Sequence, residues 1–214
     1  MLYNDLIAKQ MAKYLLDIQA VKLNVKEPFT WASGIKSPIY CDNRKILSYP
    51  DIRTYVCNSM TEIIKAKYPE AEIIAGVATG AIAIGMLAAQ ALNLPYIYIR
   101  SSQKDHGLQN KIEGILEKNK KVVVIEDLVS TGKSSLDAVH AVREAGARVL
   151  GMVAIYTYGL PASVDNFNNA QCNLTTLTNY DTTITAALDI EYIKGDELET
   201  LKDWKKNPSE WHNK

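Results

Sequence analysis

Two adjacent acids and a hydroxyl-rich turn are the residues of this chain whose types and spacing best suit chemistry. Glu126 and Asp127 directly follow the apolar run 122–125, and residues 130–135 read Ser-Thr-Gly-Lys-Ser-Ser. A turn between a buried strand and a helix offers backbone N–H groups and the positive helix end to a phosphate dianion. The hydroxyls that would assist are those of Ser130, Thr131, Ser134 and Ser135. Because carboxylates accept hydrogen bonds from vicinal hydroxyls, we expect a ribose 5-phosphate to be held at both ends.

This stretch has two alternative interpretations. Gly132-Lys133-Ser134 is similar to the end of a nucleotide-binding P-loop, but that motif needs a glycine where this chain has Asp127. Alternatively, the two acids would only end a strand, and Ser130 and Thr131 would only cap a helix. Two acids beside so apolar a strand are costly to bury, so a ligand site is the stronger prediction.

A second turn between a strand and a helix is predicted at Ala78-Thr79-Gly80, within the sequence AGVATGA of residues 75–81. Small residues let a bulky anion approach the backbone amides. On its own, this spacing of glycines is equally consistent with close packing of helix on strand. It does not match the dinucleotide-binding fingerprint, because Ala78 stands at the place of the middle glycine.

Cationic side chains gather after the predicted strand 96–99, at Arg100, Lys104 and His106, beside Gly107. A mobile cationic lid over the two anion sites would stabilise negative charge that develops during a reaction and would exclude water. A solvated charged loop is the alternative for such a segment.

The elements that would position these residues follow a regular order. Strands are predicted at 72–77, 96–99, 121–125 and 148–158, and helices at 79–92 and 131–145. Continuous apolar strands that alternate with helices indicate an α/β fold, with a mostly parallel central sheet flanked by helices on both faces.

The two ends of the chain have a different pattern. Helices are predicted at 3–19 and 51–66, and the segment 21–42 between them is extended and contains turns at Gly34 and Pro38. The region 161–203 predicts a helix, a short strand at 173–177 and terminal helices. Trp204 and Trp211 lie near the polar C-terminus, which is expected to be frayed, and no functional role is expected for either residue. A single domain over residues 1–214 is the simplest organisation.

Composition excludes several classes of protein. The 214 residues carry 24 basic and 24 acidic side chains, a balance that gives no electrostatic footprint for nucleic acid or an anionic membrane. Cys41, Cys57 and Cys172 are scattered, so neither a disulfide framework nor a cysteine zinc site is expected. Charged residues interrupt every apolar run of the first twenty residues, which argues against a signal peptide or membrane span. A cytoplasmic protein is therefore expected.

The stretch 123–135 resembles the signature with which type I phosphoribosyltransferases bind phosphoribosyl pyrophosphate. The resemblance implies that family's fold and a magnesium ion carried by the pyrophosphate and ribose hydroxyls. It implies no ligation of a metal by protein side chains. Asp127 and Lys104 would be catalytic, with Lys104 reaching the neighbouring subunit's site in a homodimer. Pyrophosphate would meet Ala78, Thr79 and Gly80. The substrate would also contact Arg100, Lys104, His106, Glu126, Asp127, Leu128, Val129, Ser130, Thr131, Gly132, Lys133 and Ser134.

The segment 29–44 resembles the N-terminal hood of orotate phosphoribosyltransferases, whose pattern is SG-x-KSP-x-Y-x-D-x-R. The hood would comprise residues 1–45 and part of the C-terminal region, around a core of about residues 50–180. The ring carboxylate of orotate needs hydrogen-bond donors, for which the resemblance implies Ser33, Gly34, Lys36 and Ser130. Some family members have lysines where this chain has Ala32, Gly80 and Ser101, so Lys36, Arg44 and Lys133 are candidates to replace them.

The resemblance implies transfer of a phosphoribosyl group to N1 of orotate, with release of pyrophosphate. A purine or xanthine phosphoribosyltransferase would share the core and differ in the hood. A non-catalytic regulator with this fold would be expected to carry a basic stripe or an added DNA-binding module. A fused decarboxylase barrel would need about 250 further residues.

Overall fold

A six-stranded sheet forms the centre of the computed structural model, which describes residues 2–31, 34–100 and 111–211. Its strand order is β10-β9-β8-β5-β6-β7, and all neighbours are parallel except β6 and β7. The strands span β5 (Ile73–Val77), β6 (Tyr96–Ile99), β7 (Ile112–Glu113), β8 (Lys121–Val129), β9 (Arg148–Thr157) and β10 (Leu174–Asn179). The predicted α/β class with a mostly parallel sheet is confirmed.

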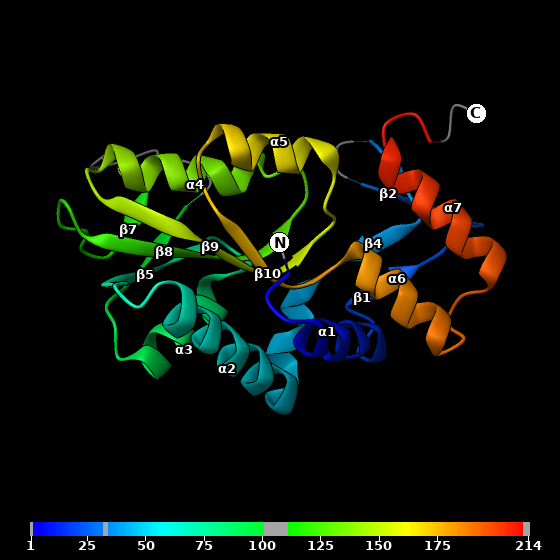
Figure 1. Ribbon diagram of the computed structural model, residues 1–214, viewed down its shortest axis with the longest axis horizontal. Helices are drawn as coiled ribbons and strands as arrows, with labels where there is room; N and C mark the ends of the chain where they lie inside the picture. Colours follow the sequence, from blue (N-terminus) through cyan, green and yellow to red (C-terminus); the bar gives the residue numbers. More distant parts are fainter. Residues whose placement is uncertain (1, 32–33, 101–110, 212–214) are drawn as a thin grey trace.

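Helices cover both faces of this sheet (Figure 1): α4 and α5 lie on one face, and α2 and α3 on the other. The helices span α1 (Asp5–Asp17), α2 (Pro50–Lys67), α3 (Ile82–Leu92), α4 (Lys133–Glu144), α5 (Pro161–Asn169), α6 (Tyr180–Asp189) and α7 (Gly195–Lys206). In the described part of the chain, no helix combines the length and the apolar character needed to cross a bilayer.

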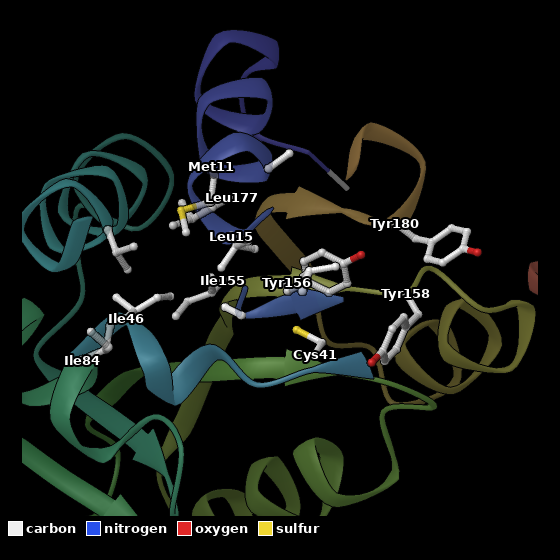
Figure 2. Close-up of a cluster of buried hydrophobic side chains, with 14 of the residues drawn as sticks. Met11, Leu15, Cys41, Ile46, Ile84, Ile155, Tyr156, Tyr158, Leu177 and Tyr180 are labelled. Atoms are coloured by element: carbon white, nitrogen blue, oxygen red, sulfur yellow. The ribbon is translucent and has the colours of Figure 1, made fainter. Parts of the chain in front are cut away.

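The alternation of side chains along β8 explains why both faces need a cover. Val122 and Val124 belong to one buried cluster with α4, whereas Val123 and Ile125 belong to a second cluster with α1, α2 and α3. Figure 2 shows part of the second cluster, in which Met11 and Leu15 of α1 meet residues of β9 and β10. The continuous apolar run of the strand is therefore the direct result of burial on both sides.

The hood elements lie at one end of the molecule (Figure 1). They are the antiparallel pairs β1 (Val21–Leu23) with β4 (Ile39–Cys41) and β2 (Phe29–Thr30) with β3 (Lys36–Ser37), together with α6 and α7. The 3-10 helix η1 (Asn43–Ser48) follows β4 and leads into α2. At the start of α1, Asn4 is the N-cap and accepts hydrogen bonds from the amides of Leu6 and Ile7.

Two boundaries differ from the sequence prediction by three residues or more. The strand predicted to end at residue 125 continues to Val129, because β9 extends far enough to pair with Leu128 and Val129. The helix predicted from residue 79 begins at Ile82, after a turn closed by a hydrogen bond from the Ala81 amide to the Val77 carbonyl. In both cases tertiary pairing or a local turn overrides the apolar pattern.

Trp204 is fully buried, so the expectation of a frayed terminus at this residue was wrong. Its ring lies 5.6 Å from Trp31 and 5.3 Å from Tyr180, measured between centroids. Tyr158 completes the contact, with its centroid 5.9 Å from Trp204. We call Trp31, Tyr156, Tyr158, Tyr180 and Trp204 the aromatic cluster; it joins the last turn of α7 to the hood and to β9.

Replacing Trp204 with alanine should destabilise the fold by about 3–5 kcal/mol, the range observed when a fully buried large aromatic side chain is removed. Urea unfolding followed by circular dichroism measures this. The matched control is Tyr192→Ala, a ring that is 41% exposed, which should change the free energy of unfolding by about 0.5 kcal/mol or less. A loss below about 1 kcal/mol for Trp204→Ala would show that α7 is not anchored through this ring.

Candidate active site

A cavity of about 430 Å³ opens at the carboxyl ends of β5, β6 and β8. Ligands of open α/β sheets bind at this edge. The cavity is bordered by the hood, the turn after β5, the end of β6, the acid pair and α4. Its lining residues are Cys41, Asp42, Arg44, Val77, Ala78, Thr79, Gly80, Ile99, Arg100, Lys111, Glu126, Asp127, Leu128, Ser134, Asp137 and Ala138.

The two acids of β8 have different environments. Glu126 is only 5% exposed, and its carboxylate accepts hydrogen bonds from the Ser135 hydroxyl (2.8 Å) and the Asp127 amide (3.0 Å). Burial raises the pKa of Glu126 well above its ordinary value, and the negative charge of Asp127 raises it further. Asp127 is only partly buried and is the more accessible acid. Glu126 is therefore a buried residue of the site that links β8 to α4 through Ser135, and Asp127 is the acid that is accessible from the cavity.

Ser135 differs from its predicted role. Its hydroxyl is buried and donates to Glu126, so it is not free to bind a phosphate. The physical reason is that Ser135 lies on the inner face of α4, one residue beyond Ser134, which lines the cavity. The hydroxyls predicted to bind phosphate are therefore reduced to those of Ser130, Thr131 and Ser134.

The turn after β5 lies against the acid pair. A Cβ atom at Gly80 would collide with the Asp127 carboxylate, so the two residues are in close contact across the sheet edge. The Ala78–Thr79 peptide bond of this turn is cis. Only glycine leaves room for the observed position of Asp127, which gives a physical reason for the glycine at this position.

The N-terminus of α4 is open to a ligand. Its N-cap is Gly132, with a φ of +83°, and no side chain of the described residues caps the helix. The alternative that Ser130 and Thr131 merely cap this helix is therefore wrong. Asn166 of α5 donates to the Thr131 carbonyl at 2.9 Å and holds the loop. Uncapped N–H groups at a helix N-terminus are a favourable anion site.

Two arginines bring positive charge to the cavity. Arg44 makes a bidentate pair with Asp42, with Nε to Oδ1 at 2.6 Å and Nη2 to Oδ2 at 3.1 Å. The hydrogen bond from Arg44 lowers the pKa of Asp42, which keeps this carboxylate ionised. Arg100 directly follows β6, and its Nη1 atom lies 3.5 Å from Oε1 of Glu113. The cavity thus combines acids, cations and backbone amides.

Comparisons with known proteins agree with this geometry. Residues 51–180 match the family model for the phosphoribosyl transferase domain. The chain is 53% identical to orotate phosphoribosyltransferase of Porphyromonas gingivalis over 205 residues, which cover 96% of this chain and 98% of that protein. This chain belongs to the orotate phosphoribosyltransferase family. The protein of the same name from Listeria monocytogenes is 52% identical over 96% of this chain and 98% of its own length.

Solved structures of this family share the fold. Orotate phosphoribosyltransferase of Aeropyrum pernix has a TM-score of 0.74 and 23% identity, over 86% of this chain and 99% of that one. UMP synthase of Leishmania donovani has a TM-score of 0.77 and 25% identity; the match covers 92% of this chain but 42% of that longer one. The type I phosphoribosyltransferase fold expected from the sequence is therefore confirmed.

Several residues that the orotate phosphoribosyltransferase resemblance singled out meet in the cavity. They are Ala78, Thr79, Gly80, Arg100, Glu126, Asp127, Leu128 and Ser134. Residues 129–133, predicted to contact the ribose phosphate, continue the same segment but are not among the described residues that line this cavity. Lys104, His106 and Ser33 lie outside the described residues. Their assignments remain predictions.

The predicted orotate ligands of the hood are placed differently from Arg44. Lys36 is exposed, and its ammonium donates to the Thr30 hydroxyl at 2.8 Å, whereas Gly34 forms a turn with a φ of +83°. Neither residue is part of the cavity lining, whereas Arg44 is. Among the candidates for the absent lysines, Arg44 is therefore the one that the fold brings to the site.

Sequence reasoning missed two residues next to the acids. Cys41 lines the cavity, and Asn43 donates from its side-chain amide to the Asp127 carbonyl at 2.6 Å. The position of both within the hood motif was the available signal, but their distance from Asp127 along the chain hid the contact.

Replacing Glu126 with glutamine should raise the free energy of unfolding at about pH 8. The raised pKa of Glu126 means that its contribution to stability is complete below the unfolded pKa of about 4.3 and is lost as the pH rises through the folded pKa. Each pH unit between the two pKa values corresponds to about 1.4 kcal/mol. Urea unfolding at several pH values should show the advantage of Glu126→Gln shrinking toward about pH 4.

The control for this experiment is Glu70→Gln, at an exposed turn outside the cavity, which should leave the pH dependence unchanged. An advantage of Glu126→Gln that stays constant with pH would show that ionisation of Glu126 does not oppose folding.

Proposed function

We propose that this chain transfers the phosphoribosyl group of 5-phosphoribosyl 1-pyrophosphate to orotate, with Mg²⁺, giving orotidine 5′-phosphate and pyrophosphate in pyrimidine synthesis. The observation that carries the proposal is the meeting of the turn after β5, the acid pair and the start of α4 at one cavity. Identity of 53% to a protein named orotate phosphoribosyltransferase supports orotate as the base.

Each part of the first substrate has a complementary group. The open N-terminus of α4 and the Ser134 hydroxyl suit the 5-phosphate. The Asp127 carboxylate suits the ribose hydroxyls, because it is the accessible acid of the pair. The backbone of Thr79 and Gly80 suits the pyrophosphate, with Arg100 to balance its charge.

The reaction breaks the bond between C1 of ribose and the pyrophosphate oxygen, and the electron pair leaves with pyrophosphate. The N1 atom of orotate supplies the electron pair of the new bond to C1 and loses its proton. Positive character on the ribose is stabilised by the nearby Asp127 carboxylate, and negative charge on the leaving group by Arg100 and the lid residues Lys104 and His106. In this proposal Lys104 acts from the neighbouring subunit.

Mg²⁺ suits the oxygen-rich chemistry of this cavity. The carboxylate of Asp127 is the more accessible of the two for an ion that arrives with the substrate, whereas that of Glu126 is buried and accepts hydrogen bonds from Ser135 and the Asp127 amide. When bound, the ion would neutralise charge on the pyrophosphate.

Orotate carries a ring carboxylate, and Arg44 places a guanidinium in the cavity beside the acid pair. Because Asp42 engages the Nε and Nη2 atoms of Arg44, the guanidinium is held in a fixed orientation while Nη1 can serve a second partner. The hood residues Ser33, Gly34 and Lys36 and the loop residue Ser130 complete the proposed base site.

A homodimer with a shared lid is part of this proposal. The helix α3 exposes two large apolar side chains, Met86 (45% exposed) and Leu87 (37%), on a surface that a second copy could cover. The three cysteines are free thiols, which fits the cytoplasmic location that we propose.

The native chain should consume orotate in the presence of phosphoribosyl pyrophosphate and Mg²⁺, measured by the ultraviolet absorbance of orotate. Asp127→Asn and Lys104→Ala should each lower kcat by about 100-fold or more, since each removes a charge that acts in the transition state. Asp165→Asn, at an exposed position of α5 away from the cavity, should retain native activity. Turnover of a purine instead of orotate would refute the proposed base, and no turnover of any base would refute the proposed enzyme.

Gly80→Ala should lower kcat/KM for phosphoribosyl pyrophosphate by about 10-fold or more, because the added methyl group must displace the Asp127 carboxylate. The matched control is Gly195→Ala at the start of α7, where an added Cβ atom meets no neighbour within 4 Å. Equal activity of Gly80→Ala and the native chain would show that the contact between Gly80 and Asp127 has no part in substrate binding.

A further inference from the structure

Asn43 forms a buried link between the hood and the acid pair. Its side chain is 3% exposed, and its Nδ2 atom donates to the backbone carbonyl of Asp127 at 2.6 Å. The two residues lie 84 positions apart in the chain. The contact therefore joins the start of η1 to the end of the central strand β8, at the edge of the cavity.

A second hydrogen bond fixes the orientation of this amide. The Cys41 thiol lies 3.3 Å from Oδ1 of Asn43 and can donate to it, which leaves the NH₂ group facing Asp127. Cys41 is itself buried and lines the cavity. The three residues form a chain of contacts from β4, through η1, to β8.

Asn43 gives the Asp127 carbonyl a partner at a place that β5 does not reach. The pairing of β5 with β8 runs only as far as Gly76 and Ile125, so β5 provides no partner for Asp127. Asn43 itself is nearly excluded from solvent, and its hydrogen bond to Asp127 is partly buried. Loss of a partner at a buried polar group costs about 1–3 kcal/mol.

The neighbours of Asn43 show what this link positions. Asp42 and Arg44, on either side, line the cavity and form an ion pair with each other. Asp127 presents its side chain to the same cavity. A rigid link from Asn43 to the Asp127 backbone therefore sets the hood pair at a fixed position relative to the carboxylate.

We propose that Asn43 is a positioning residue that holds the Asp127 carboxylate and the hood pair Asp42–Arg44 in register, so that ribose and base meet in reactive geometry. This inference rests on the proposed function, because it assigns Asp127 to the ribose and the hood pair to the base. Asn43 acts through Asp127 and does not itself touch the substrate.

A double-mutant cycle tests the proposal. Asn43→Ala should lower kcat by about 10- to 100-fold, as expected for loss of a partly buried hydrogen bond that orders a catalytic group. In an Asp127→Asn background, the same change should lower kcat by about 3-fold or less, since the group that Asn43 positions is already disabled. The matched control is Asn24→Ala, a hood asparagine whose side chain accepts from the Glu27 amide and lies outside the cavity; its kcat should be native.

Urea unfolding of each variant separates positioning from stability, and assays are run where every variant is fully folded. Unchanged kcat in folded Asn43→Ala, or equal fold losses in both backgrounds, would overturn the proposal. If the native chain turns over no base, the proposed function fails independently. In that case, the affinity for phosphoribosyl pyrophosphate, measured by calorimetry, decides whether Asn43 positions Asp127. Weaker binding to Asn43→Ala, but not to Asn24→Ala, supports the link, and equal affinities overturn it.

Discussion

The pairing of β8 with β9 beyond the end of β5 is the constraint on which the site depends. β5 stops at Val77, whereas β8 remains paired with β9 as far as Val129. The acids therefore project beyond the neighbouring strand while their backbone is still fixed by a sheet. The cavity lies beyond the end of β5, and the turn after β5 lines it. The two turns that we propose to bind anions lie beside this space.

The two adjacent acids differ in burial, and this difference gives them different roles in the site. Glu126 points into the protein beneath α4, where Ser135 satisfies its carboxylate and ties the helix to the strand. Asp127 lines the same cavity as Glu126 but is only partly buried, so it remains the more accessible acid. A buried acid with its own partners is unfavourable for stability when ionised, but it fixes the first turn of α4 relative to the accessible acid. Order in the site is thereby obtained from an interaction that adds little to the stability of the fold.

The parts of the site that the sequence predicted are local. The run 121–145 contains a strand, a turn and a helix in direct succession, so apolar periodicity and turn chemistry were enough to locate the acids and Gly132. The contact of Asn43 with Asp127 spans 84 positions, and no local pattern encodes it. Ser135 was misassigned because a run of hydroxyl residues does not show which of them faces inward. Trp204 was missed because α7 buries just Leu201 and Trp204 among charged residues, too few for a clear apolar stripe.

The aromatic cluster has an optical consequence. The chain has three tryptophans, and two of them, Trp31 and Trp204, lie in contact in this cluster. The Trp31 indole donates to the carbonyl of Ile39, and that of Trp204 to the carbonyl of Lys36, so both hold the same hood segment. Movement of that segment changes the surroundings of both indoles at once. The intrinsic fluorescence of the chain is therefore weighted toward the hood and gives a label-free signal for the state of the proposed base site.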